Sequence, residues 1–249
     1  MSGHSKWATI KHKKGAADKA RGKLFAKLIR QVEVAAREGG GDPDTNPTLR
    51  TMFQKARDNS VPLDTIERAI KRGTGELEGV TYESITYEGY APHGVAMLVE
   101  VLTDNRNRTG AEIKTIFTRN GGSLAEPGAV AWQFERRGVI IVPGHVSEED
   151  VMLVALEHGA DDIIDDGDSW RVTSEPGVLA DLREALDDAA IPVDSSEVSM
   201  VPSATVPLAD AQSASAVLRV LEALDDHDDV QAVHANFDIP DDVLRSVEV

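Results

Sequence analysis

The chain of 249 residues contains no cysteine, and this absence excludes several kinds of site at once. Without thiols there is no disulfide, no thiolate nucleophile and no cysteine-ligated zinc. Aromatic residues make up only 4% of the chain, so its cores must be built mainly from Val, Ile, Leu and Ala. No apolar run approaches the roughly 20 residues of a membrane span, and no apolar stretch follows the basic start as in a secretory signal. We therefore expect a cytoplasmic protein with no membrane partner.

Positive charge is scarce over most of the chain and concentrated in its first part. The net charge is −17, yet residues 1–75 hold 16 Lys/Arg against 8 Asp/Glu, a net of +8, and residues 76–249 carry −25. An asymmetry of this size usually indicates a polyanion partner for the basic segment. Because the acidic remainder repels phosphate, nucleic-acid contact is expected in the first third of the chain alone.

The basic segment divides into an arm and a helix. Residues 1–15 have scattered lysines and no apolar period, which predicts a flexible basic arm, whereas residues 16–37 show helical spacing with basic side chains opposite the apolar ones. Lysines neutralise phosphates with counterion release, and an indole stacks on an unpaired base. The expected nucleic-acid contacts are Lys6, Trp7, Lys11, His12, Lys13, Lys14, Lys19, Lys23, Lys27 and Arg30.

Two other interpretations of the basic helix stay open. Its lysines could form an ordinary solvated face, or the helix could meet an acidic partner, including the acidic domains of its own chain. The charge pattern also does not separate duplex DNA from folded RNA, and no recognition helix with side chains aimed at base edges is evident.

The rest of the chain predicts an α+β protein of several domains. Further helices are expected at 47–58, with Asn46 as N-cap, and at 63–72, which completes a three-helix domain over 16–78. Strands at 80–90, 94–103 and 129–134 and a helix at 106–120 follow.

A complete βαββαβ pattern occupies residues 135–202, with strands at 138–142, 161–164, 169–173 and 197–201 and helices at 147–158 and 178–190. A strand at 205–208, a helix at 209–224 and a strand at 230–237 end the chain. We predict two ferredoxin-like α+β domains, one discontinuous over 79–134 plus 203–249, with the other, 135–202, inserted in it.

Two further clusters could each be a functional site or have an ordinary structural role. Asn105, Arg106 and Arg108 at the start of a helix are a candidate second anion contact, although helix capping and Arg–Asp pairing explain them equally well. The aspartates at 161–168 and 225–229 fit no calcium-loop spacing, so no metal is expected and a solvated, phosphate-repelling surface is preferred. Protein partners of the acidic domains are a further possibility. No phosphate loop, nucleophile elbow or paired histidines occur, so we expect no enzyme, no catalytic residues and no cofactor.

Four segments resemble stretches of the YebC/PmpR family, which is related to a mitochondrial translational activator. They are GHSKWATIKHKKGAADKARGKLFAKLIR, DTNPTLRTMFQKARDNSVPLDTIERAIKRGTG, YEGYAPHGVAMLVEVLTDNRNRT and GGSLAEPGAVAWQF. The resemblance implies an all-helical N-terminal domain followed by two α+β domains, without enzymatic activity. The chain departs from the family pattern at residues 124–127, where a polar, glycine-containing turn is expected. A start at Met1 without a transit segment favours a bacterial cytoplasmic member.

The resemblance also implies a function. Members are commonly labelled transcriptional regulatory proteins that bind DNA, and others are linked to translation at the ribosome, including stalls at proline runs. We therefore expect a non-enzymatic nucleic-acid-binding regulator of gene expression that docks through its basic N-terminal domain. The alternatives are a ribosome-associated translation factor that binds rRNA or tRNA, and a protein-interaction module that binds no nucleic acid.

Overall fold

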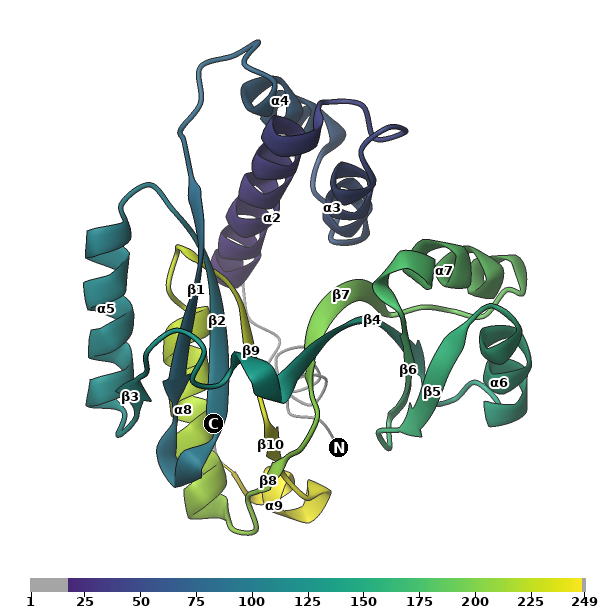
Figure 1. Ribbon diagram of the computed structural model, residues 1–249. Helices are drawn as coiled ribbons and strands as arrows, with labels where there is room; N and C mark the ends of the chain where they lie inside the picture. The colour runs from purple at the N-terminus through teal and green to yellow at the C-terminus, as the bar shows by residue number, and fades with distance from the viewer. Residues whose placement is uncertain (1–17, 248–249) are drawn as a thin grey trace.

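The computed structural model describes residues 18–247, and they form a helical domain and two sheet-containing domains. In Figure 1 the helical domain is at the top, one sheet with its helices is at the lower left, and the other is at the right. The α+β class and the helical N-terminal domain are thus as predicted from the sequence.

The helical domain consists of α2 (Asp18–Gly39), α3 (Pro47–Asp58) and α4 (Leu63–Gly73). The expected N-cap of α3 is present, since the Asn46 side chain accepts a hydrogen bond from the Leu49 amide at 3.0 Å. The same side chain donates to the carbonyl groups of Ala35 and Gly40, both at 2.8 Å, and so joins the start of α3 to the end of α2. Leu28, Val32, Leu49 and Ile66 form the centre of its core.

The first sheet-containing domain draws on both ends of the remaining chain. Its sheet has the order β3-β1-β2-β9, made from β1 (Glu83–Tyr90), β2 (Ala96–Thr103), β3 (Ser123–Leu124) and β9 (Val230–Ala235). The pairs are antiparallel. Helices α5 (Arg106–Arg119) and α8 (Ala211–Asp225) pack on one face, where Val99, Phe117 and Leu221 are buried.

The second sheet is formed by one continuous segment. Its elements are β4 (Phe134–Pro143), α6 (Glu148–Glu157), β5 (Ala160–Asp165), β6 (Ser169–Ser174), α7 (Leu179–Asp188) and β7 (Ser195–Pro202). The antiparallel order β5-β6-β4-β7 is that of a split βαβ unit. We call this segment the inserted domain.

The chain enters and leaves the inserted domain through neighbouring strands. Strands β4 and β7 pair from Phe134↔Pro202 to Ile141↔Ser195. Beyond β7, β8 (Val206–Pro207) pairs in parallel with β10 (Phe237–Asp238), and α9 (Asp241–Ser246) ends the described chain. The paired strands β4 and β7, called the paired ribbon here, are the covalent links between the inserted domain and the rest of the chain.

The prediction of a strand at 129–134 is wrong except for its last residue, Phe134. Residues Ala131–Gln133 form a 3₁₀ turn, and β4 begins at Phe134. The cause is the buried Glu88 carboxylate, which accepts hydrogen bonds from the amides of Gly128 (2.6 Å), Val130 (2.7 Å) and Ala131 (2.9 Å). Amides committed to a carboxylate are not available to a strand ladder.

The expected strand at 230–237 is divided in two. Asn236 interrupts it, because its side-chain oxygen accepts a hydrogen bond from the Ala96 amide at 2.7 Å. The backbone beyond it leaves the first sheet, and β10 pairs with β8 instead.

Candidate nucleic-acid interface

The basic face of α2 lies against an acidic segment of the same chain. This segment, residues 225–229 between α8 and β9, is called the acidic loop here. Lys23 Nζ donates to the Asp226 carbonyl at 2.9 Å, and Lys27 Nζ donates to the Asp225 carbonyl at 2.6 Å and lies 3.6 Å from its carboxylate. Three of the expected nucleic-acid contacts therefore meet intramolecular acceptors, because Arg30 pairs with the loop as well.

Arg30 makes the most contacts with the loop region. Its Nη1 lies 3.2 Å from Asp229 Oδ1, and it donates to the carbonyl groups of Leu102 at 3.0 Å and Asp228 at 3.1 Å. The guanidinium group also lies 4.9 Å from the centroid of the Tyr82 ring. These contacts hold α2 against both the sheet and the acidic loop.

Lys27 does not fit the expectation of a surface open to a polyanion. It is only 7% exposed, and its ammonium group points into the contact with Asp225. A phosphate reaches it only if α2 separates from the acidic loop. Lys23 keeps a third of its side chain exposed, and for Lys23 and Arg30 a nucleic-acid contact stays a prediction.

Asp229 is the buried centre of this contact. Its Oδ2 accepts hydrogen bonds from Thr109 at 2.6 Å, Arg108 at 2.7 Å and Thr103 at 3.2 Å. Burial by itself would raise the pKa of this carboxyl, but the hydrogen bonds from Thr109 and Arg108 outweigh burial and lower it. The aspartate is thus held ionised as a structural acceptor.

The candidate second anion contact is largely occupied by its neighbours. Asn105 caps α5, since its side chain accepts from the Arg108 amide at 3.1 Å. Arg108 pairs with Asp104 at 3.0 Å as well as with Asp229, and the Asp229 hydrogen bond is the main cause of its raised pKa. Asn105 thus has the structural role of a helix cap, and Arg108 has that of an Arg–Asp pair. Arg106 forms no ion pair within residues 18–247, so an anion contact there stays a prediction.

A hollow of about 660 Å³ opens between α2, the start of α5 and the acidic loop. Its wall includes Arg30, Tyr82, Arg108 and His227. His227 Nε2 lies 2.9 Å from a Glu112 carboxylate oxygen, and its Nδ1 accepts from the Asp229 amide at 3.1 Å. Five carboxylates line the hollow against three Lys and Arg side chains, which disfavours a bound phosphate.

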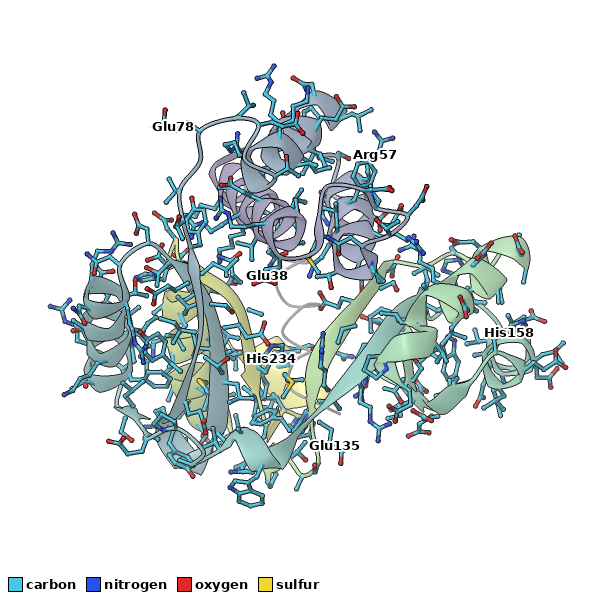
Figure 2. All side chains as sticks on the ribbon, turned by 45° about the horizontal axis from the view of Figure 1, so that its top comes forward. Glu38, Arg57, Glu78, Glu135, His158 and His234 are labelled. Carbon is cyan, nitrogen blue, oxygen red and sulfur yellow. The ribbon has the colours of Figure 1, made fainter. Side chains whose placement is uncertain are left out.

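Exposed cations are found elsewhere on the helical domain. Arg50, Arg57 and Lys71 are exposed and form no ion pair within the described part of the chain. In Figure 2 Arg57 lies on the outer surface of this domain. The sequence interpretation did not single out these residues, because it placed the expected contacts between positions 6 and 30, although the excess of +8 covers the whole of residues 1–75.

The helical domain also touches the inserted domain through ion pairs. Lys55 of α3 pairs with Glu197 of β7, and Asp58 lies 3.0 Å from Arg183 of α7. Charged contacts thus hold the helical domain to both sheet-containing domains. This is the electrostatic use of basic side chains that the sequence left open beside nucleic-acid binding.

The remaining expected contacts lie at the start of the chain. Lys6, Trp7, Lys11, His12, Lys13 and Lys14 lie outside the described residues, as does the side chain of Lys19. Within residues 18–247, no cluster of three or more His, Asp or Glu is arranged to hold a metal ion. No helix of that range is long and apolar enough to cross a membrane.

Comparisons with known proteins decide the family. Residues 5–76 match the family described as the TACO1/YebC protein N-terminal domain, and residues 82–237 match the TACO1/YebC second and third domain. The chain belongs to the TACO1/YebC family. The resemblance in the four sequence segments is thereby confirmed.

Relatives in the TACO1/YebC family are similar over their full length. A protein from Acidothermus cellulolyticus is 57% identical over 99% of this chain and 100% of its own. One from Halothermothrix orenii is 51% identical over 99% of each chain. Both are named probable transcriptional regulatory protein. The crystal structure of a conserved hypothetical protein from Aquifex aeolicus is 44% identical and superposes with a TM-score of 0.84 over 92% of this chain and 95% of its own.

Proposed function

We propose that this TACO1/YebC member is a non-enzymatic regulator of gene expression that binds nucleic acid through its basic N-terminal segment and helical domain. The supporting observation is the charge division, +8 over residues 1–75 and −25 over the rest. The names of the relatives support a regulatory role. Repulsion from the acidic domains then orients the basic end toward the phosphates.

The contacts of α2 refine which cations act first. Because Lys23, Lys27 and Arg30 pair with the acidic loop, initial contact falls to the N-terminal residues and to exposed cations such as Arg57 and Lys71. A polyanion that also uses the α2 face must displace the loop. The binding energy is then reduced by the loss of those ion pairs.

The alternative target is RNA at the ribosome. Lysines mixed with glycine and a single tryptophan in residues 1–15 suit folded RNA with unpaired bases at least as well as the groove of a duplex. The relatives are named for transcriptional regulation, a role in which DNA is the usual target. Binding of a structured RNA in preference to duplex DNA of equal length would select this alternative.

The experiment is a salt titration of binding to both nucleic acids. Removal of residues 2–14, or Arg57→Ala with Lys71→Ala, is expected to weaken binding and to reduce the slope of log affinity against log salt. The matched control is Arg119→Ala, which removes an exposed cation from α5 of the acidic part and is expected to change neither. Unchanged affinity after the truncation, or binding without a salt slope, would favour a protein-interaction module.

A further inference from the structure

Helix α6 exposes an apolar face to solvent. Leu153 is 65% exposed, Leu156 51% and Met152 40%, whereas Val151 and Ala155 on the opposite side are fully buried against the inserted sheet. Positions 152, 153 and 156 lie within one arc of the helix, because residues three and four apart share a face. Contiguous apolar exposure of this kind usually marks an interaction site.

Unpaired carboxylates surround this face. Glu148, Glu149, Asp150 and Glu157 are exposed, and none forms an ion pair within residues 18–247. The first three lie in the first turn, where acidic side chains stabilise the helix dipole. Glu157 is in the last turn, where the dipole disfavours a negative charge, so helix stability does not explain it. The acidic border of the face therefore includes one carboxylate, Glu157, that stabilisation of the helix dipole does not account for.

The face is directed away from the other domains. In Figure 1 α6 lies on the far side of the inserted domain from the helical domain and the first sheet. His158, the residue that follows α6, is at the outer edge of the molecule in Figure 2. Within residues 18–247 the apolar face is therefore not a contact between domains.

We propose that the outward face of α6 docks a basic amphipathic segment of a partner protein. Apolar side chains of that segment would cover Met152, Leu153 and Leu156, while its Lys or Arg side chains would meet Glu149 and Glu157. Residues 135–202 contain 17 Asp/Glu against 4 Lys/Arg, so charge complementarity selects a basic partner. The same charge repels nucleic acid, anionic lipid surfaces and a second copy of this domain.

The test uses the full chain and a designed peptide helix with leucines along one face and lysines elsewhere. Binding measured by calorimetry is expected, and Leu153→Ser with Leu156→Ser should weaken it by at least about tenfold, because both exposed leucines would become buried in the complex. Glu149→Gln with Glu157→Gln should weaken it and flatten its salt dependence. Both pairs lie on the surface, so folding should be unaffected.

The matched controls separate this site from general charge attraction. Glu184→Gln removes an exposed carboxylate from α7 of the same domain and is expected to leave peptide binding unchanged. A peptide with glutamate in place of lysine should not bind. Equal binding of the lysine peptide to the serine variant, equal binding of the glutamate peptide, or a dimer of the protein that the serine variant abolishes would each overturn the proposal.

A second experiment identifies what contacts the α6 face inside the cell. A photo-crosslinking amino acid at position 153 should label protein segments rich in Lys and Arg, whereas predominant labelling of acidic segments would contradict the proposal. Nucleic-acid affinity should be the same for the serine variant and the unmodified chain. Failure of this inference is therefore distinguishable from failure of the proposed nucleic-acid binding.

Discussion

Arg30 and Asp229 are separated by 199 positions in the chain, yet Arg30 Nη1 lies 3.2 Å from Asp229 Oδ1. The second oxygen of the same carboxylate accepts hydrogen bonds from Thr109 and Arg108. One buried side chain therefore joins α2 of the helical domain, α5 and the acidic loop. This contact explains how the basic helix is held on an otherwise acidic molecule.

Asp229→Asn is expected to lower the free energy of unfolding by about 2–4 kcal/mol, because it leaves the donors of Thr109, Arg108 and Arg30 without a charged acceptor. Urea denaturation measures this change. The matched control is Asp228→Asn, since the neighbouring Asp228 is exposed and its carboxylate forms no ion pair in the described part of the chain. Its effect should stay within about 0.5 kcal/mol. Equal effects of the two variants would show that the Asp229 contacts contribute little.

Stability should fall on acidification, and the sign follows from two carboxyl groups. Burial would raise the pKa of Asp229 and of Glu88, but hydrogen bonds lower both, so each binds protons less readily in the folded state. Their contribution is complete above the unfolded pKa values of about 4 and is lost as the pH falls through the folded values. Urea midpoints measured from pH 7 to pH 3 should show this decline. Asp229→Asn should flatten it, and an unchanged profile would contradict the assignment.

Neutralising the acidic loop should strengthen nucleic-acid binding. Asp225→Asn with Asp226→Asn removes two charges that compete for Lys23 and Lys27, and an increase in affinity of about threefold to tenfold is expected at low salt. Fluorescence anisotropy with a labelled oligonucleotide measures it.

The control for that experiment removes the same charge far from the basic helix. Asp181→Asn with Asp188→Asn changes two exposed residues of α7. A similar gain in both variants would reduce the effect to net charge, and no gain in the loop variant would mean that α2 takes no part in binding.

Glu88→Gln should loosen the segment at 128–131. A glutamine amide accepts with one oxygen only, so at least one of the three amide donors loses its partner, and the free energy of unfolding should fall by about 1–3 kcal/mol. Hydrogen exchange at the amides of Gly128, Val130 and Ala131 should accelerate. Glu126→Gln, at an exposed position close by, is the control and should leave exchange unchanged. Unaltered exchange in the Glu88 variant would show that the carboxylate does not order the segment.

Most of the fold follows from local signals in the sequence. Asn46 before Pro47 predicts the start of α3, and the 3.6-residue and two-residue periods predict the helices and the two main sheets. The strand at 129–134 could not be judged correctly, because the carboxylate that captures its amides is at Glu88, some 40 positions earlier. A local pattern carries no information about such a distant acceptor.

The candidate site was less predictable than the fold. Amphipathic spacing places Lys23, Lys27 and Arg30 on one face of α2, but it does not say what covers that face. The charge contrast allowed both nucleic acid and the chain's own acidic domains, and only the folded arrangement brings residues 225–229 to the helix. In this chain the two distant segments of opposite charge pair with each other.

The paired ribbon of β4 and β7 has a mechanical consequence. Residues 134–137 of β4 pair with β7 but not with β6, so any rotation of the inserted domain relative to the first sheet has to pass through this two-stranded stretch. Two ion pairs, Lys55 with Glu197 and Asp58 with Arg183, restrain such a rotation, because they join the helical domain to the inserted domain. If the helical domain separated from the inserted domain, these ion pairs would be lost and the inserted domain would be freer to rotate.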